Sequence, residues 1–472
     1  MNRIFVILFT LCWLTSCMVG PDFKRPQPVL PQKFLSQKPQ SIHHHLPLKW
    51  WHLYKSNALN ELITASLQHN PNLEATEHAL QAALENTYAV RGALFPSVSA
   101  SFAPSRQRTA DILTSVLASN EYLYSLYTGQ VYVSYTLDVF GGNRRMLEAS
   151  LAQTETQKHQ LTAAYLTLTT NVASAVIQEA ALREQISATK EIISSQRRLL
   201  QVSNKLFSLG DVARADIAIQ QAALAATEAN LPPLYKQLAI QRDLLNALTG
   251  RYSNDPSTPE IKLAALHLPG EIPTSIPASL LEHRPDIRAA EAQMHAANAL
   301  VGVAKANRLP NFTIANTNAG TAATTIGTLM DPTTRFWSLA GVIAQPIFDG
   351  GNLRHGQRAA EATYRQTAAL YRSAVINAVQ NVNDALQALF YDQQAVATAY
   401  KAYRAAQTSL EITRKQIALG DSSRTALFVT QLTYQQARFN LIQAQANQLT
   451  DSVALIQALG GGWQEIKAPF KD

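Results

Sequence analysis

Few residues of this 472-residue sequence have the types and spacing that an active site requires. Three consecutive histidines, His43, His44 and His45, are candidate metal ligands. They stand in a Pro- and Gln-rich segment without cysteine or partnering carboxylates, so no metal site is expected. The sequence contains no phosphate-binding glycine loop, dinucleotide fingerprint, zinc-binding helix or nucleophile elbow. We therefore expect neither a catalytic site nor a cofactor site, and we predict that the protein is not an enzyme.

Cys17 is the residue with the most definite predicted chemistry. It follows a basic residue, Arg3, and an apolar stretch, residues 4–14, which is shorter than the about 20 residues that span a bilayer as a helix. Leu14, three positions before the cysteine, and the small Ser16 directly before it resemble the lipobox of bacterial lipoproteins. We predict removal of the signal peptide and a covalent lipid on Cys17. The alternative is an ordinary signal peptide with an incidental cysteine.

Lipidation at this position would leave the mature chain without a free thiol and would determine the membrane to which it is sorted. Cys12 would leave with the signal and Cys17 would carry lipid, so the mature chain would have no thiol for a disulfide or a metal site. The second mature residue, Met18, is not aspartate. By resemblance to lipoprotein sorting, this favours the outer membrane.

The composition is unusual for a compact soluble domain. Charged residues make up 15% of the chain, against about 25% in ordinary soluble proteins, and Ala, Gln, Thr, Ser and Asn replace them. The net charge of +7 is scattered and forms no basic block, so no nucleic-acid partner is expected. This composition suits a protein whose surfaces face its own copies, lipid or a water-filled lumen.

Internal repetition dominates the sequence. Two prolines recur 214 residues later and two glycines recur 210 residues later: Pro71 and Pro285, Pro96 and Pro310, Gly210 and Gly420, Gly250 and Gly460. We interpret this as a duplication. The predicted organisation is a signal peptide (1–16), a lipidated N-terminal segment (17–56), a first repeat (57–250), a linker (251–276), a second repeat (277–462) and a C-terminal tail (463–472).

Each repeat contains room for one very long helix. No proline or glycine stands between Asn143 and Gly210, and only Gly356 stands between Asn352 and Gly420. Each stretch could form a helix of about 100 Å at 1.5 Å per residue. Apolar residues recur along both with a seven-residue period that admits Thr, Ser and Gln. This pattern predicts side-by-side helices in a coiled coil or a helical barrel.

Short alternating segments predict two strands in each repeat. In residues 131–139 apolar side chains take every second position, and residues 98–102, 312–315 and 336–348 are the other candidates. Alternation over about ten residues is typical of membrane-barrel strands. Known closed barrels have about eight strands or more. Four strands in lipid would leave edge N–H and C=O groups unsatisfied, so a spanning protein must oligomerise through them.

At these landmarks the sequence resembles the TolC-like outer-membrane efflux factors. The similarity is to the lipoprotein branch that serves resistance-nodulation-division pumps. It rests on the predicted mature start (residues 17–26), the pair Trp50 and Trp51, residues 283–287 at the opening of the second repeat, and residues 345–351 after its last strand. It covers essentially the whole mature chain.

The resemblance implies an α+β membrane channel. Three copies would form one tube: four strands from each would close a twelve-stranded β-barrel in the outer membrane, continuous with a long α-helical barrel across the periplasm. The homotrimer would dock on a periplasmic adaptor protein that links it to an inner-membrane resistance-nodulation-division pump. It would serve as a passive duct for drugs or other small molecules.

Two glycine-centred turns follow the long helices, at Gly210-Asp211 and at Gly420-Asp421. Glycine permits the left-handed conformation that reverses a helical hairpin tightly. In the related family these tips contact the adaptor, and the resemblance implies the same role here. The other interpretation is that the glycines are required only for the turn.

Charged residues near the tips are candidates for an entrance gate. Arg214 and Arg424 both stand four residues after the glycine, and Asp216 stands in the first copy only. Ion pairs between helices could hold the entrance closed, or these charges could be solvated helix caps. Some related proteins carry aspartates six and nine residues after the second glycine. Here Ala426 and Val429 occupy those positions, so an ion-selective ring is not indicated.

Two other functions remain open from the sequence: a duct for type I protein secretion, and a periplasmic coiled-coil interaction lipoprotein without a pore. The lipid anchor and the tryptophan pair favour small-molecule efflux over protein secretion. The alternating strands and the duplication argue against a pore-free interaction protein.

Overall fold

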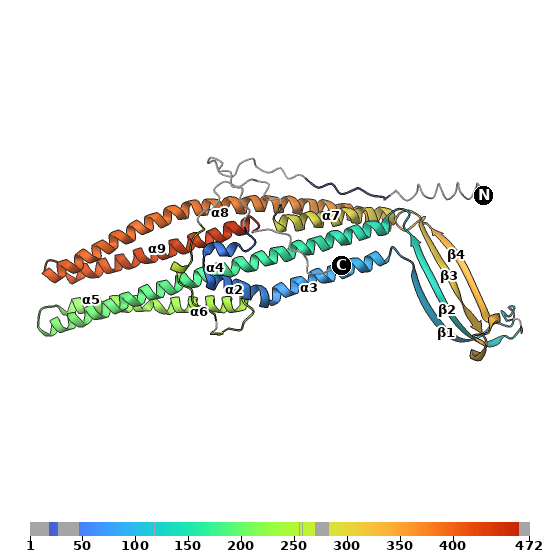
Figure 1. Cartoon of the computed structure of the whole chain (residues 1–472), viewed down its shortest axis with the longest axis horizontal. Coiled ribbons are helices and arrows are strands. Elements are labelled where there is room, and N and C mark those ends of the chain that lie inside the picture. The colour runs from blue at the N-terminus through green and yellow to red at the C-terminus, as the bar shows by residue number, and fades with distance from the viewer. Residues whose placement is uncertain are drawn as a thin grey trace. The chain divides into compact units, whose positions relative to one another are not determined.

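The computed structural model describes residues 18–26, 47–117, 119–253, 255–256, 258–269 and 283–461. The chain divides into two compact units. Unit 1 comprises Met1–Gln27, Ala79–Lys158 and Ala289–Arg372, and unit 2 comprises Pro28–His78, His159–Arg288 and Ser373–Asp472. Each unit therefore combines segments from both halves of the sequence (Figure 1).

The order of elements repeats as the sequence predicts. The first copy contains α2 (Asn57–His69), α3 (Pro71–Gly92), β1 (Ser97–Arg108), β2 (Leu123–Leu137), α4 (Gly142–Ser208), α5 (Arg214–Ala229) and α6 (Leu231–Leu248). The second contains α7 (Pro285–Ala306), β3 (Asn311–Ala323), β4 (Arg335–Ala344), α8 (Asn352–Leu419) and α9 (Arg424–Ala458). Short 3-10 helices are η2 (Trp50–Tyr54), η3 (Leu263–Ala265), η5 (Ile326–Thr328) and η6 (Pro332–Thr334).

The two predicted long helices are confirmed. α4 has 67 residues and α8 has 68, so each is about 100 Å long. In the described part of the chain, no helix combines the length and the apolar character needed to cross a membrane.

The helix that returns from the first tip differs from its counterpart in the second repeat. α9 runs unbroken for 35 residues, whereas α5 and α6 cover the equivalent span with an interruption at Asn230. Pro232 and Pro233 stand in the first turn of α6. Proline has no N–H to donate to the preceding turn, so the hydrogen-bond ladder of α5 cannot continue through them.

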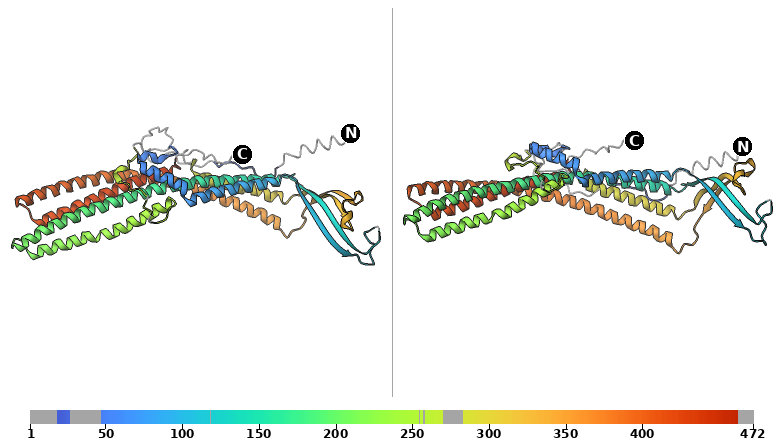
Figure 2. Two further views of the ribbon diagram at one scale, coloured as in Figure 1. Left: turned by 60° about the horizontal axis from the view of Figure 1, so that its bottom comes forward. Right: turned by 90° about the horizontal axis from the view of Figure 1, so that it is seen from below.

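The four strands form one antiparallel sheet in the order β1-β2-β3-β4. In unit 1 the sheet extends from the helix ends, and the β1–β2 and β3–β4 loops lie at its far end (Figures 1 and 2). The predicted fourth strand extended to Phe348, but β4 ends at Ala344. Pro346 cannot donate a hydrogen bond to a ladder and restricts the residue before it.

Alternation gives the sheet one mainly apolar face and one mainly small and polar face, although Tyr132, Phe336 and Val342 also lie on the second face. A bulge in β3 between Ala315 and Asn318 shifts its register, yet apolar residues stay on the same face on both sides of it. The apolar face carries Val98, Phe102, Val131, Tyr135, Trp337 and Ile343, and the opposite face carries Ser99, Ser101, Gln130, Thr136, Asn318 and Ser338. The predicted alternation is confirmed.

In unit 2 the residue before the proline that opens α3 or α7, Pro71 or Pro285, joins that helix start to the last helix of the same repeat. In the second copy, the Arg284 guanidinium donates to the carbonyl of Ala458 at 2.6 Å and to the Asp286 carboxylate at 2.7 and 3.0 Å. In the first copy, the Asn70 amide donates to the carbonyl of Leu248 at 2.9 Å. The same contact therefore closes both repeats with different side chains.

Helix α4 of the first repeat and α9 of the second pack along a polar seam in unit 2. The seam pairs Gln185 with Gln443 at 3.4 Å, Glu191 with Arg438 at 2.5 Å, and Ser195 with Gln431 at 3.3 Å. These contacts pair polar side chains of the first repeat with polar side chains of the second.

The Arg284 contact yields a stability prediction. We expect Arg284→Ala to lower the free energy of unfolding by about 2 kcal/mol, because a charge-assisted hydrogen bond to a buried helix end is lost. Asn70→Ala should cost about 1 kcal/mol. The measurement is guanidinium unfolding of the full chain in detergent, followed by helical circular dichroism. Arg354→Ala, at an exposed position of α8, is the control, and an equal loss in it would contradict the assignment.

Candidate functional site: helix tips and N-terminal strap

The two helical hairpins of unit 2 turn through the same backbone motif. Gly210 and Gly420 have φ of +85° and +83°. The N–H of the following residue, Asp211 or Asp421, returns to the carbonyl five positions earlier at 3.0 or 2.9 Å. This is the Schellman closure of a helix. A Cβ on either glycine would meet no atom within 4 Å, so the conformation, and not the available space, requires glycine.

Both turns present apolar side chains to solvent at the same end of unit 2 (Figures 1 and 2). Leu209 is 74% exposed and Leu419 is 77% exposed, and the adjacent Asp211 and Asp421 are exposed as well. A leucine beside a carboxylate at each tip offers apolar area and a charge to a protein partner. Adaptor contact at these residues remains a prediction.

The candidate gate residues are found without ion-pair partners as far as the described side chains, Arg214 and Asp216, show. Arg214 is exposed at the start of α5 and Asp216 is half-buried in its first turn, and no ion pair in the described part of the chain includes either. Arg424 begins α9, but its side chain lies outside the described residues. Ser423 caps α9 by accepting the Ala426 N–H at 3.1 Å. Pairing between copies, as a closed gate, remains a prediction.

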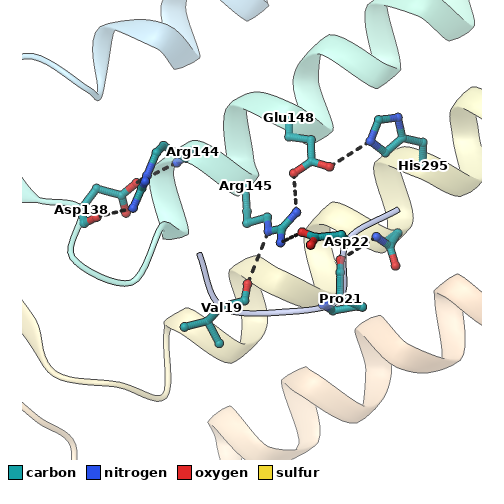
Figure 3. A network of polar contacts seen from close by, with 9 residues as sticks. Val19, Pro21, Asp22, Asp138, Arg144, Arg145, Glu148 and His295 are labelled. Atoms are coloured by element: carbon teal, nitrogen blue, oxygen red, sulfur yellow. Dashed lines mark hydrogen bonds and ion pairs between the residues drawn. The ribbon is translucent and has the colours of Figure 1, made fainter. Parts of the chain in front are cut away.

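A second site lies directly after the predicted lipidation position, in unit 1. Cys17 itself lies outside the described residues, as do His43, His44 and His45. We call residues 18–25 the strap. It lies along α4 and α7 (Figure 3). The Val19 N–H donates to the carbonyl of Phe140, just after β2, at 3.0 Å.

Arg145 on α4 is the centre of the strap's binding surface (Figure 3). Its side chain is only 3% exposed. The guanidinium pairs with Asp22 of the strap at 2.6 Å and with Glu148 at 2.7 Å, and it donates to the Val19 carbonyl at 3.4 Å. The other oxygen of Glu148 lies 2.9 Å from His295 Nε2 on α7. A buried guanidinium is stable only with such partners, so the strap completes the site.

Further contacts hold the strap on α7. The Phe23 ring stacks on His295 with centroids 4.3 Å apart, and the Asn298 amide donates to the Pro21 carbonyl at 2.8 Å. Gly20 has φ of +108°, and a Cβ on it would lie 2.5 Å from the Cα of Gly302. Two glycines are therefore needed for the strap backbone to approach α7 this closely.

Comparison with known proteins settles the family. Residues 62–251 and 276–461 match the family model described as outer membrane efflux protein. The chain belongs to this family. The predicted resemblance is thereby confirmed, and with it the predicted function: this efflux protein is an outer-membrane channel component of an efflux pump, it extends into the periplasm, and it is not an enzyme.

Individual relatives are similar over most of their length. The efflux protein is 28% identical to the pyoverdine export outer membrane protein OpmQ of Pseudomonas putida over 421 residues, 88% of each chain. It is also 28% identical to the solvent efflux pump outer membrane protein SrpC of Pseudomonas putida over 482 residues, 97% of each. The crystal structure of the Campylobacter jejuni CmeC outer membrane channel has the same fold, with a TM-score of 0.87, 20% identity and 96% coverage of both chains.

The strap contacts yield a prediction with a neighbouring control. Arg145→Ala should release the strap, because Asp22, Glu148 and the Val19 carbonyl lose their shared donor. Limited trypsin digestion of the full chain, read by mass spectrometry, should then cut after Lys24 at least about tenfold faster, the factor that corresponds to about 1.4 kcal/mol of lost docking.

Arg144→Ala is the matched control. Arg144 pairs with Asp138, which is not a strap residue, at 3.2 Å at the start of α4 (Figure 3). Equal cleavage rates in the Arg145 and Arg144 variants would show that Arg145 does not hold the strap.

Proposed function

We propose that three copies of this efflux protein form one continuous duct, which a periplasmic adaptor protein joins to an inner-membrane resistance-nodulation-division pump. Small molecules pass through the duct unchanged, and the inner-membrane partner supplies the driving force. The observation that carries this proposal is the sheet with two unpaired edges in a chain whose family resides in the outer membrane.

The edges of the sheet support closure between copies. Among the described residues, β1 pairs only with β2, and β4 pairs only with β3. Since each neighbouring pair is antiparallel, β1 and β4 run in opposite directions and can pair antiparallel across a seam. In lipid, unpaired edge N–H and C=O groups are strongly unfavourable. Barrels of about eight strands are filled by side chains, so three copies are the smallest number that leaves an open lumen.

The tips support docking on an adaptor. Gly210-Asp211 and Gly420-Asp421 form two copies of one exposed motif at the same end of unit 2. Three chains would present six such motifs, suited to a symmetric partner. We propose Arg214, Asp216 and Arg424 as inter-chain charges at the entrance, and a covalent lipid on Cys17 as the anchor that precedes the strap.

The cargo class follows from the relatives and from the sheet. One relative is named for pyoverdine export and another for solvent efflux, both at 28% identity. Such different cargoes indicate a permissive duct. The second face of the sheet carries Ser, Thr, Asn and Gln together with a few aromatic and aliphatic side chains, and it carries no charge. Such a mixed, uncharged surface suits passage of varied small molecules without a specific site.

The assembly is tested by mass and conductance. The full-length protein, extracted in mild detergent, should have three times the mass of one lipidated chain by mass photometry. It should also conduct ions in a planar bilayer. A monomer that does not conduct would overturn the proposal.

The entrance is tested on the same assembly. Arg214→Ala combined with Arg424→Ala should raise single-channel conductance, roughly severalfold, because inter-chain ion pairs that narrow the entrance are removed. Asp211→Lys combined with Asp421→Lys should lower drug efflux in cells without changing conductance. Asp243→Lys, at an exposed position of α6, is the charge-matched control. Unchanged conductance in the arginine variant would show that these residues do not form a gate and are solvated charges at the helix starts.

A further inference from the structure

The four strands carry very few charged side chains, and these side chains gather at the loop ends of β1 and β4. The only charged side chains in the four strands are Arg106 and Arg108 of β1 and Arg335 of β4. All three are exposed, and all three stand at the loop ends of their strands. The strands contain no aspartate, glutamate or lysine.

The register places all three arginines on the apolar face. Arg106 and Arg108 alternate in step with Val98 and Phe102 along β1. Arg335 alternates in step with Trp337 along β4, and the row that runs through Thr321 of β3 and Gly129 of β2 joins Arg335 to Phe102. Charges that needed only water would lie on the polar face, which lines the duct. These arginines face the lipid side instead.

The length of the apolar stretch places the β1 arginines at the membrane surface. Along β2 the stretch from Leu137 to Tyr127 spans about 25 Å after allowance for strand tilt, the height of the apolar band of such sheets. Arg106 and Arg108 pair with Ser125 and Leu123, beyond that stretch toward the loops. The helices extend into the periplasm from the other end, so this end lies among the outer-leaflet headgroups.

The seam between copies places the arginines on adjacent strands, and this step rests on the proposed trimer. β1 and β4 are the two edges, so closure places Arg335 of one copy on the strand beside Arg106 and Arg108 of the next. Arg108 pairs with Asp111 at 3.1 Å, at a largely exposed position. No ion pair of Arg106 or Arg335 is found in the described part of the chain. Clustered guanidinium groups repel one another unless an anion lies between them.

We propose that Arg106, Arg108 and Arg335 form a phosphate-binding site for a phosphorylated glycolipid of the outer leaflet, with one site at each seam. The planar guanidinium fork matches the oxygens of a phosphate, and the apolar side chains below it, Phe102 and Trp337, match the acyl chains. A bound lipid would bridge two copies of the chain and cover the seam.

The test uses the full-length trimer in neutral detergent, with lipid binding followed by native mass spectrometry. The probes are bis-phosphorylated lipid A, enzymatically dephosphorylated lipid A and phosphatidylglycerol. Binding of bis-phosphorylated lipid A should be about tenfold tighter than that of either other lipid, and Arg106→Gln with Arg108→Gln should remove most of this difference. Arg335→Gln should weaken binding non-additively with the β1 pair, since both would contact one phosphate group.

Arg91→Gln, at an exposed position at the helix end of the sheet, removes one charge as Arg335→Gln does; it is the control and should leave binding unchanged. Equal affinity for the dephosphorylated lipid, or no effect of the arginine variants, would overturn the site. Equal affinity for phosphatidylglycerol would overturn the glycolipid assignment. Mass and conductance of each sample are recorded in parallel, so a failure of the trimer to form is recognised separately. In an intact trimer, additive effects of Arg335→Gln and the β1 pair would refute only the placement of the site at the seam.

Discussion

The hydrogen-bonding groups along the edges of β1 and β4 are the constraint on which the rest of the molecule depends. A chain with four strands cannot satisfy both edges itself, and lipid offers no substitute for the missing partners. The duplication satisfies part of this requirement. Each repeat contributes two strands, and every neighbouring pair in the resulting sheet is antiparallel. In the proposed trimer, two further copies would supply the missing strand partners. On that proposal, the channel arises because the sheet of one chain is incomplete.

The strap lies close to the end of the sheet that this constraint concerns. The Val19 N–H holds the strap to the carbonyl of Phe140, three residues after the end of β2. The predicted lipid anchor, Cys17, directly precedes the strap. A lipid attached there would enter the membrane beside the strands. The buried Arg145 pairs with Asp22 of the strap as well as with Glu148 of its own helix, so the folded helices and the strap stabilise each other. Strap and sheet are thus linked by contacts within a single compact unit.

Much of this architecture was predictable from the sequence because it depends on local signals. Long stretches without proline or glycine predicted α4 and α8, and alternation predicted the strands. The strap's binding surface could not be predicted, since Arg145 and His295 lie more than 120 residues from Asp22 and show no local pattern. The face of Arg335 could not be predicted either, because the bulge in β3 alters the register and only the observed pairing relates β4 to β1.

Comparison of the two repeats shows which features the duplication left fixed. The backbone is the same at the tips, where Gly210 and Gly420 differ in φ by only a few degrees, and at the closing contact to Leu248 or Ala458. The side chains differ: an amide closes one repeat and a guanidinium the other, and prolines break one return helix only. Tight turns and helix ends admit few backbone solutions. A side chain that only needs to donate a hydrogen bond can be replaced by another donor. The two repeats therefore keep the same backbone geometry while their side chains, and the partners that these side chains bind, can differ.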